Sequence, residues 1–412
     1  MASQSLASTC FVGCRHANLL LLITRKLLDR GMSAKRLFSV LLMVVLLAGC
    51  GGPRAVLGLG AAADQAASAA DVPVYVATTR ARSDNLSLPY SAERSQTLNF
   101  ARFDIGIPRN HVPGDVEKTG RTPDSSRHFV ARSYQQIASR KQFVAQLDAA
   151  LAQRPPQERE IFIFVHGYNN NFADSVFRAA QIAHDYNVRA VTLHYAWPSG
   201  GALPLYVYDR DSTVVGRGGL AETIEIAAQT KANRVILVGH SMGAYVVMEA
   251  LRELAQTGRR HAIKRLGGVV LAAPDIDIDA FQSQVRDIGE LPMPFAIVVS
   301  RRDRALGISR RIAGGHPRVG SGSDIALLQQ KHITVLDASE VDGGSHNIFA
   351  TSPTLIGFAG QSGLLRRLIE GGDASAGETI LADGGSVIEG AAALVIYLPG
   401  RILGGVALAS RL

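Results

Sequence analysis

Three residues whose side chains can cooperate in one reaction follow one another in the second half of the 412-residue chain: Ser241, Asp303 and His346. A serine hydroxyl is a poor nucleophile until a base removes its proton. A histidine does this well when a buried carboxylate fixes its tautomer and stabilises the cation that forms. The order serine, acid, histidine is that of α/β-hydrolases. We therefore predict Ser241 as a nucleophile, Asp303 as the acid and His346 as the base.

The surroundings of Ser241 fit this role. The sequence GHSMG at 239–243 follows the apolar run 235–238 and precedes a helical pattern, which is the context that a nucleophile elbow requires. Glycines two positions before and after the serine leave room for backbone that passes close by. Such a turn lifts the hydroxyl clear of the sheet and points the amide of Met242 at the same space. Met242 is thus predicted to supply one oxyanion donor.

A second oxyanion donor is predicted after an earlier strand. The apolar run 161–165 is typical of a strand buried on both faces, and HGYNNN follows it at 166–171. In α/β-hydrolases an HG-type turn in this place supplies the other oxyanion amide. The predicted donor is the backbone N–H of Tyr168. His166 is expected to be structural, and Asn171 is expected to cap the next helix.

Two assignments stay open from the sequence. Asp275 also follows a predicted strand and is the alternative acid, although Asp303 is favoured because it lies in the usual loop. Trp197, the only tryptophan, follows the predicted strand 190–195. It either lines the substrate pocket or anchors the core.

Predicted strands alternate with predicted helices over most of the chain, which indicates an α/β-hydrolase fold with a mostly parallel central sheet and helices on both faces. Each candidate catalytic residue follows a strand, where parallel sheets place their sites. The expected strands are 72–78, 100–107, 161–165, 190–195, 235–238, 268–272, 294–300 and 333–336. The expected helices are 142–151, 172–183, 220–229 and the one after 243, and the segments 79–99, 108–135 and 202–218 are expected to be loops or surface.

Composition argues against several other kinds of function. The formal charge is +8, but residues 1–49 hold six basic residues and one acidic residue, a net of +5, which leaves +3 for the rest. So small an excess argues against a nucleic-acid partner. The cysteines Cys10, Cys14 and Cys50 all lie in the first fifty residues, and no zinc-ligand or phosphate-loop motif occurs. We expect no metal and no cofactor.

The first fifty residues are typical of an export signal. A basic pair at 35–36 precedes an apolar stretch at 37–48, which is too short to span a bilayer permanently. The stretch ends in LAGC at 47–50, which resembles the lipobox of bacterial lipoproteins. We expect lipidation of Cys50, with Met32 as the true start of translation. The lipid would anchor the protein to a membrane of the cell envelope, facing the periplasm or the cell surface.

Composition shifts divide the chain into four parts. They are a leader with the signal peptide at 1–50, a flexible tether at 51–70, the α/β-hydrolase domain at 71–358 and a Gly/Ala-rich tail at 359–412. The tail contains the apolar run 391–398, which is too short to span a membrane. This run is expected to pack on the domain, to pair with another chain or to lie on a membrane. The sequence decides neither between these nor the oligomeric state.

Several stretches together resemble a known family. They are PVYVATTR, FVHGYNNNF, HYAWPSGG, LVGHSMGAYV, VVSRRDRAL and GSHNIF. In these, the chain is similar to bacterial α/β-hydrolases of uncharacterised function that are described as esterase-like or lipase-like. The resemblance covers 72–353 and implies a Ser–Asp–His hydrolase fold without naming a substrate.

The expected function is hydrolysis of a carboxylic ester, from a small molecule or a lipid, through an acyl-enzyme on Ser241. One alternative is a non-catalytic binding protein of the envelope that keeps the fold. Against it, a scaffold does not require all three catalytic groups. The other alternative is an acyltransferase, which would use the same residues with an acceptor other than water.

Overall fold

The computed structural model describes residues 54–59, 68–118, 123–362 and 394–397, with the backbone alone for 358–362. The chain divides into two units, Met1–Arg54 and Ala55–Leu412, and the fold described below belongs to the second. The predicted leader, with Met32 and Cys50, and most of the predicted tail lie outside the described residues. In the described part, no helix has the length and apolar character needed to cross a membrane.

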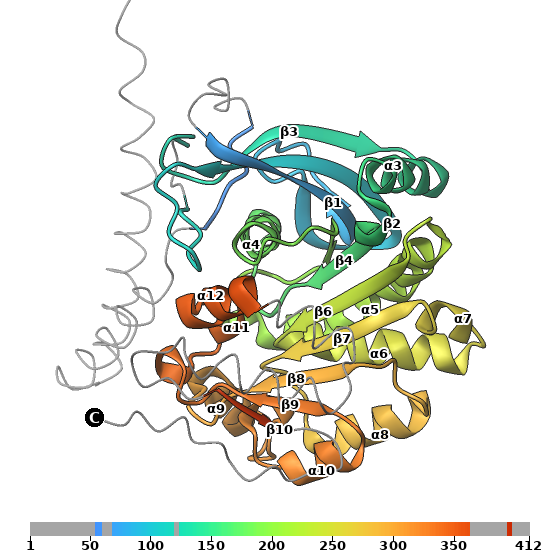
Figure 1. The fold of residues 1–412 in the computed structure, drawn as a ribbon, viewed down its shortest axis with the longest axis vertical. Helices are drawn as coiled ribbons and strands as arrows, with labels where there is room; N and C mark the ends of the chain where they lie inside the picture. The colour runs from blue at the N-terminus through green and yellow to red at the C-terminus, as the bar shows by residue number, and fades with distance from the viewer. Residues whose placement is uncertain (1–53, 60–67, 119–122, 363–393, 398–412) are drawn as a thin grey trace, which may run out of the picture. The chain divides into compact units, whose positions relative to one another are not determined.

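One sheet organises the second unit, and its described part has ten strands in the order β10-β9-β8-β7-β6-β4-β5-β1-β2-β3 (Figure 1). The strands are β1 (Ser68–Arg82), β2 (Tyr90–Pro108), β3 (Val130–Ile137), β4 (Glu160–Val165), β5 (Val191–Ala196), β6 (Arg234–His240), β7 (Leu266–Ala272), β8 (Phe295–Val299), β9 (Thr334–Asp337) and β10 (Val395–Tyr397). The pairings from β1 through β5, β4, β6, β7 and β8 to β9 are all parallel. Pairings with β2, β3 and β10 are antiparallel. The prediction of a mostly parallel sheet is therefore confirmed.

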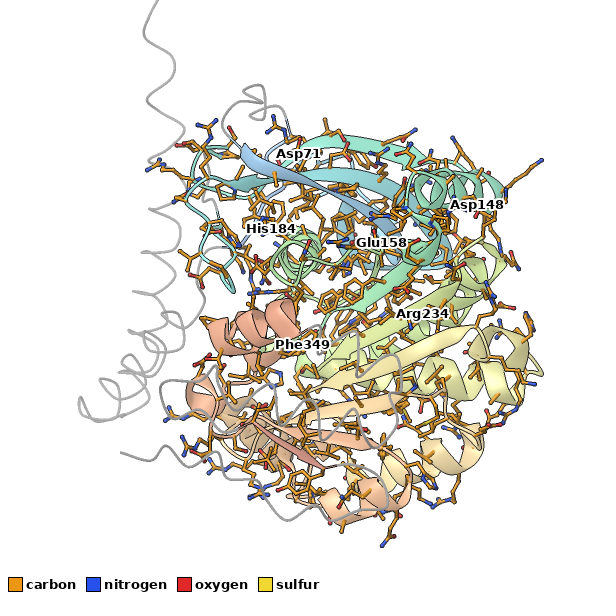
Figure 2. All side chains as sticks on the ribbon, viewed as in Figure 1. Asp71, Asp148, Glu158, His184, Arg234 and Phe349 are labelled. Carbon is orange, nitrogen blue, oxygen red and sulfur yellow. The ribbon has the colours of Figure 1, made fainter. Side chains whose placement is uncertain are left out.

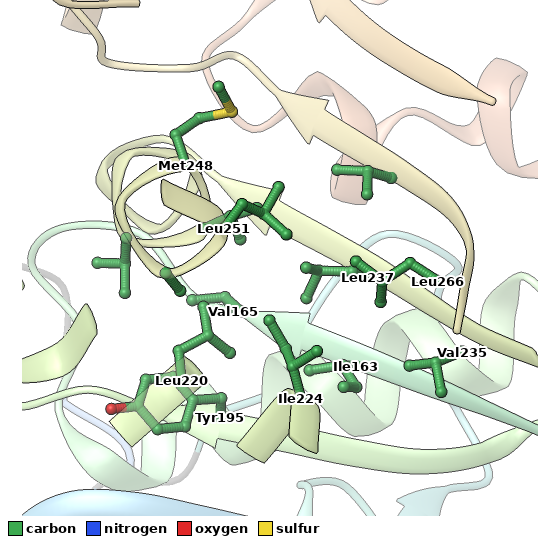
Figure 3. Close-up of a cluster of buried hydrophobic side chains, with 14 of the residues drawn as sticks. Ile163, Val165, Tyr195, Leu220, Ile224, Val235, Leu237, Met248, Leu251 and Leu266 are labelled. Carbon is green, nitrogen blue, oxygen red and sulfur yellow. The ribbon is translucent and has the colours of Figure 1, made fainter. Parts of the chain in front are cut away.

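Helices cover both faces of this sheet. They are α3 (Arg140–Ala152), α4 (Phe172–Asp185), α5 (Tyr206–Gln229), α6 (Met242–Gln256), α7 (Arg260–Ile263), α8 (Ile278–Ile288), α9 (Arg304–Ile312), α10 (Ile325–Gln330), α11 (Ile348–Thr351) and α12 (Pro353–Ser362). Strand β4 explains the arrangement, because Ile163 packs into the core under α5 and α6 while Phe164 packs into the core under α4. Figure 3 shows Ile163 with Leu220, Leu237 and Leu251 in the first of these cores. A strand buried on both faces must be apolar throughout, as the sequence predicted.

The first three strands differ from expectation. The segment 79–99 is not a loop, because β1 continues to Arg82 and β2 begins at Tyr90. The segment 108–135, predicted as surface, contains most of β3. In both places polar residues interrupt the apolar pattern. Some, such as Arg80, are buried and hydrogen-bonded, and others, such as Gln135, face solvent on an edge strand. Neither kind gives an apolar pattern.

Helix α5 also differs from expectation. The segment 202–218 was predicted as a loop or small cap, yet α5 begins at Tyr206 and runs for 24 residues. Its buried face in the first turns is made of polar and small residues, Asp209, Ser212, Thr213 and Gly216. A helix that buries such residues shows no apolar repeat at the helical period, so the pattern hides it.

The two ends of the predicted domain are also corrected. The flexible tether predicted at 51–70 is wrong at two described places, since Ala55 and Leu57 are fully buried and β1 begins at Ser68. Backbone hydrogen bonds join Leu57 to Ser87 and to Ala131, at 3.0 and 2.6 Å. At the other end, β10 adds three residues of the tail to the sheet beside β9. Of the three fates considered for the apolar tail, packing on the domain is the one observed for 395–397.

Candidate active site

Ser241 occupies a strained turn between β6 and α6. Its backbone has φ 55° and ψ −123°, a region that residues other than glycine rarely adopt. The residue is nearly buried, and its N–H donates to the carbonyl of Ala272 at 2.9 Å. Strain that the surrounding structure maintains is a common property of functional sites. The geometry is that of a nucleophile elbow.

Three glycines permit the close backbone approach that this turn needs. A Cβ on Gly243 would lie 2.3 Å from the carbonyl oxygen of His166, and one on Gly239 would lie 2.8 Å from Val247 Cγ2. A Cβ on Gly167 would lie 2.9 Å from Ser241 Cβ. The turn after β4 therefore lies directly against the elbow serine, which is the position that the predicted oxyanion loop must occupy.

His346 and Asp303 are hydrogen-bonded to each other. The distance from His346 Nδ1 to Asp303 Oδ2 is 2.6 Å, the Asp303 side chain has no exposed surface and the His346 side chain is 20% exposed. Asp303 also caps α9, because its Oδ1 accepts from the N–H of Leu306 at 2.9 Å. A carboxylate on Nδ1 fixes the tautomer with the proton on that nitrogen and leaves Nε2 as an acceptor.

His240, which sequence reasoning passed over, holds the His346 segment next to the elbow. Its Nε2 lies 3.1 Å from the His346 carbonyl oxygen, so this nitrogen carries a proton and donates it. The two imidazole rings lie 5.0 Å apart between centroids. Burial, together with the neighbouring His346, lowers the pKa of His240 to about 3, so this ring is neutral near pH 7. The His346 backbone is thus hydrogen-bonded to the residue directly before Ser241.

No hydrogen bond of Ser241 Oγ occurs among the described residues, and such contacts are often long before substrate binds.

The alternative acid Asp275 lies in a different network. Its carboxylate contacts Arg318 Nε at 3.3 Å and accepts from Ser309 Oγ at 2.6 Å and from Tyr206 Oη at 3.1 Å. The Asp275 and Arg318 side chains are each 5% exposed. In the described part of the chain, Asp303 is hydrogen-bonded to the His346 ring and Asp275 is not. Asp275 serves instead to neutralise a buried arginine.

The two predicted oxyanion donors come from the two turns that meet at Ser241. Met242 is the first residue of α6, so its N–H has no acceptor within the helix. Tyr168 follows Gly167 in the turn after β4, and its hydroxyl donates to the carbonyl of Leu203. Asn171 caps α4 with a complete capping box, as predicted.

Trp197 and His166 form a stacked pair inside the protein. Their ring centroids lie 5.1 Å apart, and the Trp197 indole N–H donates to the His166 carbonyl at 2.6 Å. Trp197 has no exposed surface. Its surroundings therefore support the core-anchor role, and not the pocket-lining one, of the two left open by the sequence. Burial lowers the pKa of His166 well below its ordinary value, which fits the structural role expected for it.

A second cluster of titratable residues lies away from the elbow. His111, His184 and Asp185 have ligand-type atoms within 4.8 Å of one another. Asp185 Oδ1 accepts from His111 Nε2 at 2.7 Å and from His184 Nδ1 at 2.8 Å, while Oδ2 accepts from Gln181 and from the N–H of Gly114. Both carboxylate oxygens are therefore already satisfied by protein donors. The cluster requires no cation to balance its hydrogen bonds.

Comparison with known proteins adds a family. A family model described as alpha/beta hydrolase of unknown function (DUF900) matches residues 139–366. No curated protein sequence matches the chain.

Solved structures with a similar fold are only distantly similar. One is esterase B from Lactobacillus rhamnosis, solved with a tributyrin phosphonate inhibitor. It aligns with a TM-score of 0.32 and 14% identity, and the alignment covers 55% of this chain and 78% of that chain. A putative hydrolase from Agrobacterium vitis aligns with a TM-score of 0.34 and 14% identity over 71% and 98%. A lipase-esterase related protein from Clostridium acetobutylicum aligns with 0.27 and 12% over 51% and 94%.

The family match spans more than half of the chain and includes the elbow, the Asp303 turn and the His346 segment. It starts at residue 139, after β3, so the three strands that extend the sheet on that side lie before the matched region. Together with the mostly parallel sheet and its helices on both faces, this match identifies the fold class that the sequence predicted. The chain belongs to the family of alpha/beta hydrolases of unknown function (DUF900).

Proposed function

We propose that the protein is a serine hydrolase that cleaves carboxylic esters through an acyl-enzyme intermediate. The observation that carries the proposal is the 2.6 Å hydrogen bond between His346 Nδ1 and Asp303 Oδ2, made next to a serine on a strained elbow. A merely structural histidine does not need a buried carboxylate on one nitrogen and a free acceptor on the other. This pairing is the one that general-base catalysis requires.

In the proposed reaction, Ser241 Oγ attacks the carbonyl carbon of the ester while its proton passes to His346 Nε2. The tetrahedral oxyanion accepts hydrogen bonds from the backbone N–H groups of Met242 and Tyr168. Collapse of this intermediate expels the alcohol, which takes the proton from His346. A water molecule then repeats the sequence on the acyl-enzyme and releases the carboxylic acid.

The substrate is proposed to carry an apolar group, as a small-molecule or lipid ester does. Support comes from the surface beside the oxyanion loop. Leu203 and Leu205 are large apolar residues that are exposed to solvent, and the Tyr168 hydroxyl donates to the Leu203 carbonyl. This apolar surface therefore lies next to the Tyr168 side chain, and we propose that an acyl or alkyl chain of the substrate buries it on binding.

The proposed function predicts covalent labelling at one residue. A fluorophosphonate probe is expected to form an adduct on the peptide that contains Ser241, because the activated hydroxyl displaces fluoride from phosphorus. Mass spectrometry of the digested protein checks the site, and Ser241→Ala is expected to remove both the adduct and turnover of p-nitrophenyl esters. Absence of any adduct on correctly folded wild-type protein would disprove the hydrolase.

We also propose that the protein is a lipoprotein anchored through Cys50. The support is the LAGC sequence at 47–50 after an apolar stretch. Because the folded unit begins at Ala55, four residues separate it from the proposed lipid on Cys50, and the chain from Cys50 to Ala55 spans at most about 18 Å. This separation between lipid and folded unit is shorter than the one that the tether predicted at 51–70 would give.

Replacing Cys50 tests this anchor. Cys50→Ala is expected to abolish incorporation of labelled fatty acid and to move the protein from the membrane fraction to the soluble fraction, because the acyl chains supply the membrane affinity. Fractionation of the expressed full-length chain and detergent partitioning measure the change. A Cys50→Ala protein that stays with the membranes as completely as the wild type would contradict the lipoprotein proposal.

A further inference from the structure

The loop that carries Tyr168 has a backbone that needs outside support. Asn169 has φ 61°, in the left-handed region, which asparagine adopts more readily than most residues other than glycine, helped by local hydrogen bonds. The loop also lies against Ser241 through Gly167. Hydrogen bonds from neighbouring groups can therefore fix the peptide planes of this loop.

Asp209, in the first turn of α5, fixes one end of this loop. Its Oδ2 accepts from the N–H of Asn169 at 3.3 Å and from Ser199 Oγ at 2.6 Å, while its Oδ1 accepts from the N–H of Gly200 at 2.6 Å. Ser199 Oγ in turn accepts from the N–H of Asn170 at 3.3 Å. Three donors converge on the two oxygens of one carboxylate, and an asparagine, with a single oxygen, offers fewer acceptor sites.

Arg80, from β1, fixes the other end. Its guanidinium donates to the carbonyl of Asn170 at 2.9 Å and to that of Ser91 at 3.1 Å. Arg80 is 1% exposed and Asp209 is fully buried. Burial lowers the pKa of Arg80 to about 10, so the group is still charged at neutral pH, and the Asp209 charge acts in the opposite direction. Burial likewise raises the pKa of Asp209, while hydrogen bonds from Gly200 and Ser199 oppose that shift.

The fixed peptide planes determine where the oxyanion donor points. Asn170 Nδ2 donates to the Gly167 carbonyl at 3.1 Å and to the Tyr168 carbonyl at 2.9 Å. The Gly167 carbonyl and the Tyr168 N–H belong to the same trans peptide, so they point in opposite directions. His166 Nδ1 lies 2.8 Å from the same carbonyl oxygen, and holding the carbonyl toward these two side chains aims the N–H away from them. Asn170 is itself held by Arg80 and, through Ser199, by Asp209.

We infer that Asp209 and Arg80 are positioning residues that together aim the Tyr168 N–H at the oxyanion. The inference rests on the proposed function. The two groups carry opposite charges, so their interaction orders the loop without placing an uncompensated negative charge near an anionic transition state. A carboxylate alone would oppose the oxyanion, and a neutral acceptor would not bind three donors.

The test replaces Asp209 and compares rate with binding. Asp209→Asn is expected to lower kcat for p-nitrophenyl butyrate about 10- to 100-fold with KM within twofold, because a misaimed donor stabilises the transition state less and leaves ground-state binding intact. The second-order rate of fluorophosphonate labelling is expected to fall by a similar factor. If Asp209→Asn does not fold, Ser199→Ala removes the acceptor of the Asn170 N–H and one donor to Asp209, leaves the Asp209 contacts with Asn169 and Gly200, and is expected to lower kcat in the same direction.

Glu249→Gln is the matched control. Glu249 is another nearly buried carboxylate, on α6, that accepts from Gln284 at 2.7 Å and lies near Arg217 and Arg252. Its replacement is expected to lower the melting temperature and to leave kcat within twofold. A kcat for Asp209→Asn within twofold of wild type, or an equal loss of kcat in Glu249→Gln, would overturn the inference.

A measurement without substrate separates this inference from the proposed function. Asp209→Asn is expected to speed hydrogen exchange of the Asn169 and Asn170 amides by about tenfold, because Asp209 accepts from Asn169 and holds the Ser199 hydroxyl that accepts from Asn170. Unchanged exchange there would refute the positioning role even in an active enzyme. If wild-type protein neither turns over esters nor reacts with the probe, the proposed function fails, and the exchange result still decides whether Asp209 orders the loop.

Discussion

Asp303→Asn is expected to lower ester turnover about 10⁴-fold, by analogy with triad aspartates in serine proteases. The His346 ring now donates its Nδ1 proton to Asp303 Oδ2 across 2.6 Å. An asparagine can present its NH₂ group to that nitrogen, which favours the tautomer with the proton on Nε2, where it cannot accept the serine proton. The measurement is the steady-state rate with p-nitrophenyl butyrate, corrected for the folded fraction.

Asp275→Asn is the matched control for that experiment. Both carboxylates are nearly buried and both follow a strand of the parallel sheet. Removing the Asp275 charge leaves Arg318 buried without its partner, which is expected to cost on the order of 3 kcal/mol of unfolding free energy. The folded fraction is expected to keep its turnover within about tenfold of wild type. A large loss of turnover at Asp275 with little at Asp303 would reverse the assignment of the acid.

The parts of the fold that the sequence predicted well are those where hydrophobic burial determines the pattern. Strands β4 and β6 are buried on both faces, so they read as continuous apolar runs. Gly239 near the end of β6 and Gly243 at the start of α6 flank a turn that leaves no room for a side chain at either position. Helix α4 was predictable because it combines an apolar stripe with an asparagine cap at Asn171.

The parts that were missed depend on buried polar residues. Arg80 and Asp209 look like surface residues in the sequence, but the structure buries both. Their partners lie far along the chain: Arg80 is 90 positions from Asn170, and Asp209 is 40 positions from Asn169. Pattern alone carries no information about such partners. Buried polar residues also concealed the first turns of α5, whereas β3 was concealed by the exposed polar residues of an edge strand.

The candidate site likewise has features that the sequence could predict and others that needed the structure. The strained elbow at Ser241 and the pairing of His346 with Asp303 could be predicted, because the proposed roles require particular residue types in a particular order along the chain. The choice of Asp303 over Asp275 rested in the sequence on the usual loop alone, since both residues follow strands that end at the same edge of the sheet. The structure adds the distance that distinguishes the two carboxylates, since the His346 ring is hydrogen-bonded to Asp303 at 2.6 Å.

The cluster of His111, Glu117 and Asp185 is expected to make the stability of the folded protein depend on pH. Both ring nitrogens of His111 face carboxylates, Nδ1 toward Glu117 at 2.9 Å and Nε2 toward Asp185 at 2.7 Å, so the cation is the form that satisfies both contacts. Burial opposes protonation, but the hydrogen bonds to Asp185 and Glu117 outweigh it and raise the pKa of His111 from 6.5 to about 9. The same contacts, with that from His184, lower the pKa of Asp185 despite its burial.

These shifts fix the sign of the pH dependence. A group whose pKa is raised on folding stabilises the folded state fully below its unfolded pKa and loses that contribution as pH rises through its folded pKa. For His111 the contribution is complete below about pH 6.5 and is lost by about pH 9 to 10. The lowered pKa of Asp185 acts in the opposite sense, since its contribution is lost as pH falls below about 4. The cluster is therefore expected to stabilise most near pH 5 to 6.5.

Hydrogen bonds connect the His111 cluster to the segment that carries the proposed base. Gln181 Nε2 donates both to Asp185 Oδ2 and to the carbonyl of Ala350 in α11, and Tyr186 donates to the carbonyl of Phe349. Figure 2 labels His184 at the end of α4 and Phe349 in α11. Helix α11 begins two residues after His346. Weakening the cluster is thus expected to loosen the chain directly after the base.

His111→Asn measures this contribution in urea unfolding at pH 6 and pH 9.5. The loss of unfolding free energy relative to wild type is expected to be larger at pH 6 by up to about 3 kcal/mol, the value that corresponds to the shift of the His111 pKa. His184→Asn is the control, because this ring is 34% exposed and contacts a single carboxylate. Its effect is expected to change less between the two pH values. An equal loss at both pH values for His111→Asn would mean that His111 is neutral in the folded protein, and that packing alone accounts for its contribution.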